Sequence, residues 1–151
     1  MRKLLLDIDE NLQVYIGGRL LVVLVLGLLT FTGYLIVGLP NALILAIIAA
    51  ITSIIPIIGP IIGILPAIFI ALTVNLILTL KVLIVMIIVQ QLEGNVIQPN
   101  IQGGRLNIHP LVVIFLVIIY ILLFGFLGAL FAVPSYVVFR VVISDLRNME
   151  Y

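Results

Sequence analysis

The side chains able to bind a solute or an ion gather in one stretch of this chain, residues 90–110. This stretch holds four glutamines, three asparagines, one glutamate, one arginine and the only histidine. A carboxamide both donates and accepts hydrogen bonds, so a group of carboxamides can hold a neutral hydroxylated solute without a countercharge. Four of these residues are predicted to form a solute-binding rim: Gln90, Gln91, Asn95 and Gln98. The alternative is that these side chains make turns and cap helices.

Glu93 is the only acidic residue of the stretch and its sharpest candidate for an ion site. Apolar surroundings disfavour the charged form of a carboxyl group, so a glutamate placed there can take up a proton or a sodium ion. Binding of that ion could then be coupled to transport. The alternatives are a glutamate at the water interface, or one paired with Arg105. His109 is a candidate pH-sensitive gate, or a residue that simply begins a helix.

Other kinds of chemistry have little support in the sequence. The chain has no cysteine and one histidine, so we expect no metal site. The three serines, Ser53, Ser135 and Ser144, lie in no Gly-x-Ser-x-Gly motif. Phosphate-binding and dinucleotide-binding motifs are absent as well, so we expect no catalytic residue and no cofactor. Any active transport would then draw its energy from a gradient.

The composition indicates a membrane protein. Of 151 residues, 65% are hydrophobic and 9% are charged, and the mean hydropathy is +1.50. A soluble domain carries about 25% charged residues and about 45–50% apolar ones. The composition therefore excludes a soluble enzyme and a disordered linker, and a net charge of +1 offers no basic surface for nucleic acid. We predict an all-α, multi-pass transmembrane protein in a lipid bilayer.

Charged residues, glycines and prolines divide the chain into hydrophobic segments of about 20–39, 42–55, 60–74, 76–91, 111–124 and 126–144. We expect an interfacial or cytoplasmic helix over 1–18, a transmembrane domain over 19–145 that includes a polar loop at 92–110, and a cytoplasmic tail at 146–151. Arg19 is expected at the mouth of the first span, where it can reach lipid headgroups. Basic residues flank both ends, which by the positive-inside rule places both termini in the cytoplasm.

Prolines and small residues predict a helical hairpin in the second apolar tract. Pro56, Gly59 and Pro60 are expected to form an elbow, since proline removes a backbone donor, and this elbow acts either as a hinge or as a static turn. Small residues recur every four positions on either side of it, which lets helix backbones approach closely: Ala42, Ala46 and Ala50 before the elbow, then Gly59, Gly63, Ala67 and Ala71. The prediction is a re-entrant or strongly tilted hairpin. The alternative is one kinked span followed by a loop.

Three separated motifs carry a resemblance to a known family. Residues 89–99 read VQQLEGNVIQP and are followed by Gly104-Arg105 and His109-Pro110; residues 55–60 read IPIIGP; Gly125–Gly128 and Ala132–Pro134 come last. In this order they resemble the AI-2E transporter family, and the chain is similar to the C-terminal half of its longer members.

The resemblance implies gradient-driven export of a small hydrophilic signal such as autoinducer-2, a quorum-sensing molecule. It also implies a bacterial or archaeal inner membrane and homo-oligomers, with pentamers as one possibility. Two other functions stay open. One is a sodium (or other cation)/proton antiporter, and the other is a non-transporting membrane assembly subunit or truncated half-transporter.

Overall fold

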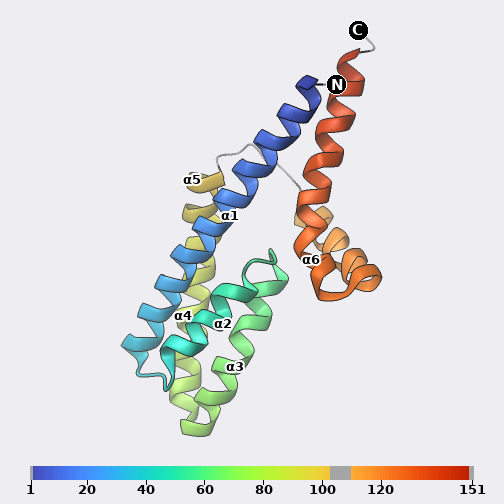
Figure 1. Ribbon diagram of the computed structural model, residues 1–151. Coiled ribbons are helices and arrows are strands. Elements are labelled where there is room, and N and C mark those ends of the chain that lie inside the picture. The colour runs from blue at the N-terminus through green and yellow to red at the C-terminus, as the bar shows by residue number, and fades with distance from the viewer. Residues whose placement is uncertain (1, 103–109, 150–151) are drawn as a thin grey trace. The chain divides into compact units, whose positions relative to one another are not determined.

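The computed structural model of the chain describes residues 2–102 and 110–149, and it contains no strand within these ranges. Its elements follow the chain as α1 (Arg2–Val37), α2 (Ala42–Thr52), α3 (Ile58–Val74), α4 (Leu76–Leu92), the π-helix η1 (Glu93–Ile97), α5 (Gln98–Gln102) and α6 (Pro110–Met149), shown in Figure 1. The chain divides into two compact units. One is Arg19–Gly103, and the other combines Met1–Gly18 with Gly104–Tyr151.

Three stretches of the described residues are helical, long and apolar enough to cross a membrane: Ile8–Val37, Leu76–Ile101 and Leu111–Ile143. The prediction of an all-α, multi-pass membrane protein is confirmed. Helices α2 and α3 have 11 and 17 residues. At a rise of about 1.5 Å per residue, both are shorter than a hydrocarbon core of roughly 30 Å.

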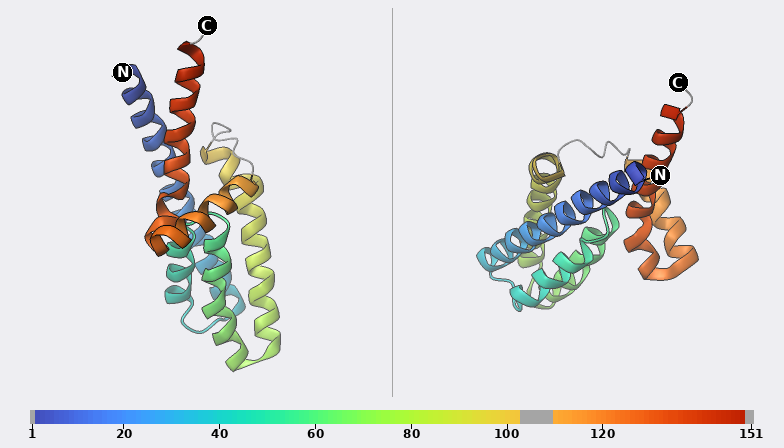
Figure 2. Two further views of the ribbon diagram at one scale, coloured as in Figure 1. Left: turned by 90° about the vertical axis from the view of Figure 1, so that its right-hand side faces the viewer. Right: turned by 45° about the horizontal axis from the view of Figure 1, so that its top comes forward.

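In the unit Arg19–Gly103, α2, α3 and α4 run up and down side by side (Figures 1 and 2). Tyr34 of α1 is fully buried among them. Around it lie the small side chains of Ala46 on α2 and of Ala67 and Ala71 on α3, together with Val82 on α4. Because methyl groups fill so little space, three helices can approach the tyrosine ring at once.

Glycines set the closest approaches in this unit. A Cβ on Gly63 would lie 2.8 Å from the Cα of Ala49 on α2, so α2 and α3 touch along their backbones. A Cβ on Gly27 of α1 would lie 3.1 Å from the Cβ of Ala50. Of the small residues singled out in the sequence, Ala50 therefore faces α1, whereas Ala42, Ala46, Ala67 and Ala71 belong to the core around Tyr34.

The elbow between α2 and α3 lies earlier than expected. Helix α2 ends at Thr52 and α3 begins at Ile58, so Pro60 stands in the first turn of α3 rather than before it. The first four N–H groups of a helix have no partner within that helix, so a proline there removes no hydrogen bond. Pro66 lies inside α3 without ending it.

Two further boundaries differ from the prediction. The predicted helix over 1–18 is not a separate element in its described part, because α1 continues without a break from Arg2 to Val37. The segment expected as a polar loop at 92–110 is helical over its described part, through η1 and α5, while 103–109 lie outside the described residues. In a regular α-helix the ring of Pro99 would collide with the carbonyl group of Asn95, which favours the wider π-turn that precedes it.

In the other unit, the N-terminal part of α1 packs on α6. Tyr15 is buried against Val133 and Val137. Helix α6 is interrupted at Gly125, whose φ of 66° and ψ of −155° suit glycine alone. This is the point at which the sequence predicted a break between 111–124 and 126–144. After the break α6 turns back, so that a Cβ on Gly128 would overlap the carbonyl oxygen of Tyr120.

Candidate functional site

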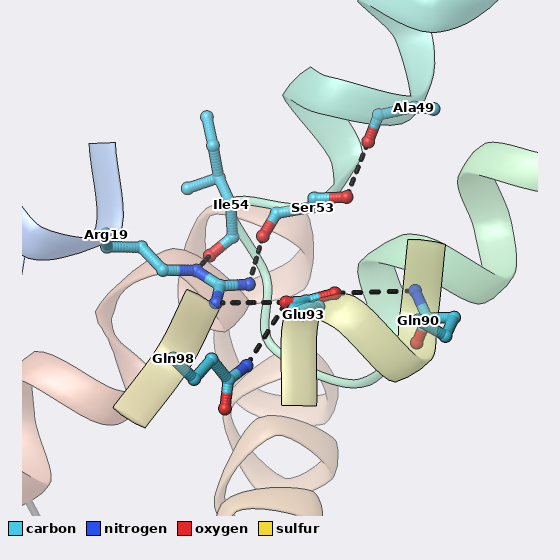
Figure 3. A network of polar contacts seen from close by, with 7 residues as sticks. All are labelled: Arg19, Ala49, Ser53, Ile54, Gln90, Glu93 and Gln98. Atoms are coloured by element: carbon cyan, nitrogen blue, oxygen red, sulfur yellow. Dashed lines mark hydrogen bonds and ion pairs between the residues drawn. The ribbon is translucent and has the colours of Figure 1, made fainter. Parts of the chain in front are cut away.

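A carboxylate and a guanidinium meet in the interior of the unit Arg19–Gly103. Glu93 begins η1 and is 4% exposed, and Arg19 on α1 is 5% exposed. Arg19 Nη1 lies 3.5 Å from Glu93 Oε1. Figure 3 marks this ion pair with a dashed line. The only other charged residue of this unit is Lys81, which is exposed on α4. The pair therefore joins the unit's lone acid to its one buried base.

Two glutamine amides complete the surroundings of the carboxylate. Gln98 Nε2 donates to Glu93 Oε1 at 3.1 Å, and Gln90 Nε2 donates to Oε2 at 3.4 Å. The π-turn explains why Gln98 reaches it. The backbone N–H of Gln98 donates to the carbonyl oxygen of Glu93, and this i to i+5 spacing brings side chains five residues apart onto one face. Each carboxylate oxygen thus has an amide donor, and one also faces Arg19.

Arg19 also binds the end of helix α2. Its Nε donates to the carbonyl oxygen of Ile54 at 3.3 Å, and its Nη2 donates to the carbonyl oxygen of Ser53. Ser53 is the C-terminal cap of α2, where carbonyl groups lack partners within the helix. A cation is favourable at that end of a helix. One guanidinium therefore connects α1, the α2–α3 elbow and η1 (Figure 3).

The predicted solute-binding rim is divided between two faces. Gln90, which is exposed, and the half-buried Gln98 bond to Glu93. Gln91 and Asn95 are exposed and bond to each other, with Asn95 Nδ2 donating to Gln91 Oε1 at 2.9 Å. An α-helical or π-helical backbone cannot direct consecutive carboxamides to the same side. The structure thus separates an inner polar group around Glu93 from an outer carboxamide pair.

The elbow holds an unusual backbone conformation. Ile57 has φ 69° and ψ −56°, and the N–H of Ile58 donates to the carbonyl oxygen of Pro56 at 2.8 Å. These values define a classic γ-turn, which is rare and strained, and more so for a β-branched residue. Gly59 and Pro60 are buried directly after it. A Cβ on Gly59 would overlap the carbonyl oxygen of Thr52, so only glycine fits there.

Sequence reasoning misplaced the cation of this site. Arg19 was expected at the membrane surface, and it is instead buried against Glu93. Arg105, considered as one alternative partner for Glu93, and His109 lie outside the described residues. The sequence did contain one signal for this pair. The unit has a single acidic residue and few bases, and a carboxylate is buried favourably only when it is paired with a cation. Among the described residues, no cluster of His, Cys, Asp and Glu could hold a metal ion.

These features define the class of protein: a helical, multi-pass membrane protein with broken helices and a hydrogen-bonded ion pair buried between them. Comparison with known families makes the assignment specific. The profile of the AI-2E family transporters matches residues 1–148, and the chain belongs to that family. The resemblance carried by the three sequence motifs is thereby confirmed.

Several curated relatives are similar over nearly the whole chain. YueF of Bacillus subtilis (strain 168), named as a candidate transport protein, is 45% identical over 138 residues, which are 91% of this chain and 37% of YueF. YrrI of the same organism, also named as a candidate transport protein, is 40% identical over 95% of this chain and 41% of its own length. PerM of Escherichia coli (strain K12), named as a candidate permease, is 39% identical over 91% of this chain and 39% of PerM.

The chain spans about two fifths of the length of these relatives. No solved structure matches it.

Proposed function

We propose that this chain forms all or part of a gradient-driven transporter that exports a small hydrophilic signal such as autoinducer-2, with Glu93 as its proton-binding or cation-binding group. Membership of a transporter family supports transport as such. The observation that carries the more specific proposal is the buried contact between Glu93 and Arg19. Ionisable groups within membrane segments are costly to bury and commonly belong to ion pathways and proton relays.

The chemistry of such a cycle follows from the pair. While Glu93 is ionised, it balances the charge of Arg19 and accepts hydrogen bonds from Gln90 and Gln98. A proton on the carboxylate removes that balance, so the positive charge of Arg19 then lacks the negative charge of Glu93 in an apolar interior, which is unfavourable. The protonated and ionised states therefore favour different arrangements of the helices around the pair. Alternation between two arrangements is what transport requires.

The exposed carboxamide pair supports the solute part of the proposal. Gln91 and Asn95 lie on the outside of a stretch apolar enough to cross a membrane, Leu76–Ile101. Polar side chains at such a position are favoured where they face a water-filled path or another protein surface. Their amides carry no charge and can both donate to and accept from a hydroxylated solute. We further propose an inner-membrane location, cytoplasmic termini and assembly into homo-oligomers such as pentamers.

Efflux from proteoliposomes tests the proposal. Vesicles that contain the 151-residue chain are loaded with autoinducer-2, and efflux is measured with and without an inward proton gradient. We expect gradient-dependent efflux that Glu93→Gln makes independent of the gradient, because glutamine keeps the shape but has no titratable proton. Glu10→Gln is the matched control, since it removes one exposed carboxylate and should leave the gradient dependence unchanged.

The two other functions give different outcomes. A sodium-dependent pH change without any organic solute would indicate cation/proton antiport. A well-folded chain that transports nothing, in vesicles where YueF does transport, would mean that these 151 residues act as an assembly subunit or as half of a transporter. Efflux that keeps its full gradient dependence in Glu93→Gln would contradict the role of Glu93.

A further inference from the structure

The strained elbow and the ion pair are physically connected. Ile57 sits in a γ-turn, a conformation that persists only where the surrounding structure holds it. Three and four residues earlier, the carbonyl groups of Ile54 and Ser53 accept hydrogen bonds from Arg19. The same guanidinium faces Glu93. Two of the contacts that hold the elbow, beside its own backbone hydrogen bonds, therefore come from the partner of the proposed ion-binding residue.

We infer that Arg19 is a positioning residue that couples the charge of Glu93 to the conformation of the elbow. The strained conformation of Ile57 relaxes, and the elbow opens, when Arg19 no longer binds the carbonyl groups of Ser53 and Ile54. The importance of this coupling for transport rests on the function proposed above. The coupling itself requires no solute and can be measured separately.

Neutralisation of Glu93 should open the elbow. A guanidinium that is 5% exposed and has lost its carboxylate is unfavourable in an apolar interior. The Arg19 side chain is long enough for its guanidinium group to move toward water. When it does, the carbonyl groups of Ser53 and Ile54 lose their donors, and nothing from Arg19 then opposes relaxation of Ile57 toward ordinary φ values. The elbow should open as a consequence.

The charged surroundings of Glu93 are simple. Arg19–Gly103 contains three charged residues in all, and Lys81 is the third, exposed on α4 twelve positions before Glu93. Arg19 from α1 and the neutral amides of Gln90 and Gln98 are the groups in contact with the carboxylate. No second acid in this unit competes for Arg19.

Cysteine labelling tests the coupling, because the chain has no cysteine of its own. Ile55 lies in the elbow and is 2% exposed, so Ile55→Cys reports opening through its rate of reaction with a water-soluble maleimide. Thr79→Cys is the matched reporter, since Thr79 is also buried but lies on α4. In the purified 151-residue chain without solute, we expect Glu93→Gln to raise labelling at position 55 by about tenfold, the effect of a strain of this kind. Position 79 should change less than about twofold.

Two substitutions at position 57 separate stored strain from side-chain size. Glycine adopts positive φ without cost, whereas alanine does not. Ile57→Gly added to Glu93→Gln should therefore return labelling at position 55 close to the unsubstituted rate. Ile57→Ala, which removes nearly the same volume, should restore it much less.

The result that would overturn the inference is labelling at position 55 that Glu93→Gln leaves unchanged. An equal rise at positions 55 and 79 would also overturn it, because the whole unit would then loosen rather than the elbow. Equal restoration by Ile57→Gly and Ile57→Ala would refute the strain at Ile57. Since no solute is present, failure of efflux in proteoliposomes would leave these outcomes intact.

Discussion

Arg19 on α1 and Glu93 on η1 form an ion pair at 3.5 Å with both side chains 6% exposed. Such a pair contributes little net stability relative to an apolar replacement, because desolvation of both charges opposes their attraction. Loss of one partner has a much larger effect, because the other charge stays buried without compensation. This asymmetry makes the pair well suited to a switch, and it can be tested with substitutions alone.

Arg19→Leu should lower the free energy of unfolding by about 3–5 kcal/mol, because it leaves Glu93 buried without its cation. The double variant with Glu93→Leu should recover much of that loss, so the two effects will not add. Denaturant unfolding in detergent, followed by circular dichroism, measures both. Lys81→Leu removes one exposed positive charge from the same unit and should change the stability by less than about 0.5 kcal/mol. Additive effects of the two leucine substitutions would contradict the pairing.

Much of the helical architecture could be predicted from the sequence, for identifiable reasons. Apolar runs and glycine or proline breaks indicated α2, α3 and α4, and Gly125 marked the interruption of α6. The length of α1 was missed because the charges of residues 1–18 were taken to mark a separate element. Those charges are fully compatible with a helix, and the segment contains no proline to end one.

The site was predicted in part. Composition singled out Glu93 and its neighbouring carboxamides, but their division into an inner and an outer group depends on a π-turn that has no clear sequence pattern. The partnership with Arg19 depends on how α1 lies against η1, which is a matter of long-range packing. The strain at Ile57 was missed because sequence reasoning placed the elbow at its prolines, while the unusual φ falls on the isoleucine between them.

Gly63→Ala should weaken the α2–α3 hairpin by about 1–3 kcal/mol, the usual effect of an added methyl group in a tightly packed interface. The new Cβ would lie 2.8 Å from the Cα of Ala49, and backbone there cannot easily move away. Gly17→Ala is the matched control, because nothing lies within 4 Å of its Cβ position on α1. It should stabilise the chain by up to about 1 kcal/mol through helix propensity. Equal unfolding temperatures for the two variants would show that the approach at Gly63 is not tight.

Gly125→Ala should destabilise the bend in α6 by about 1–3 kcal/mol, since φ 66° and ψ −155° lie in a region that side chains with a Cβ avoid. Space is not the cause, because nothing lies within 4 Å of the Cβ position. Limited proteolysis near residues 120–128 should therefore become faster in this variant, while cleavage in the α2–α3 hairpin stays constant. Unchanged proteolysis would mean that the bend tolerates an ordinary residue.

Substitution of the outer and the inner carboxamides should have different consequences. Gln91→Ala and Asn95→Ala alter an exposed pair whose side chains bond to each other at 2.9 Å, so stability should change by less than about 0.5 kcal/mol. If these amides face the solute path, efflux in proteoliposomes should show a raised KM. Gln98→Leu removes a donor to a buried carboxylate and should cost about 1–3 kcal/mol of stability. Leucine occupies a volume similar to that of glutamine, so the loss of stability would come from the lost hydrogen bond rather than from a cavity. Loss of stability in the outer variants, with normal KM, would assign Gln91 and Asn95 to helix structure instead of the solute path.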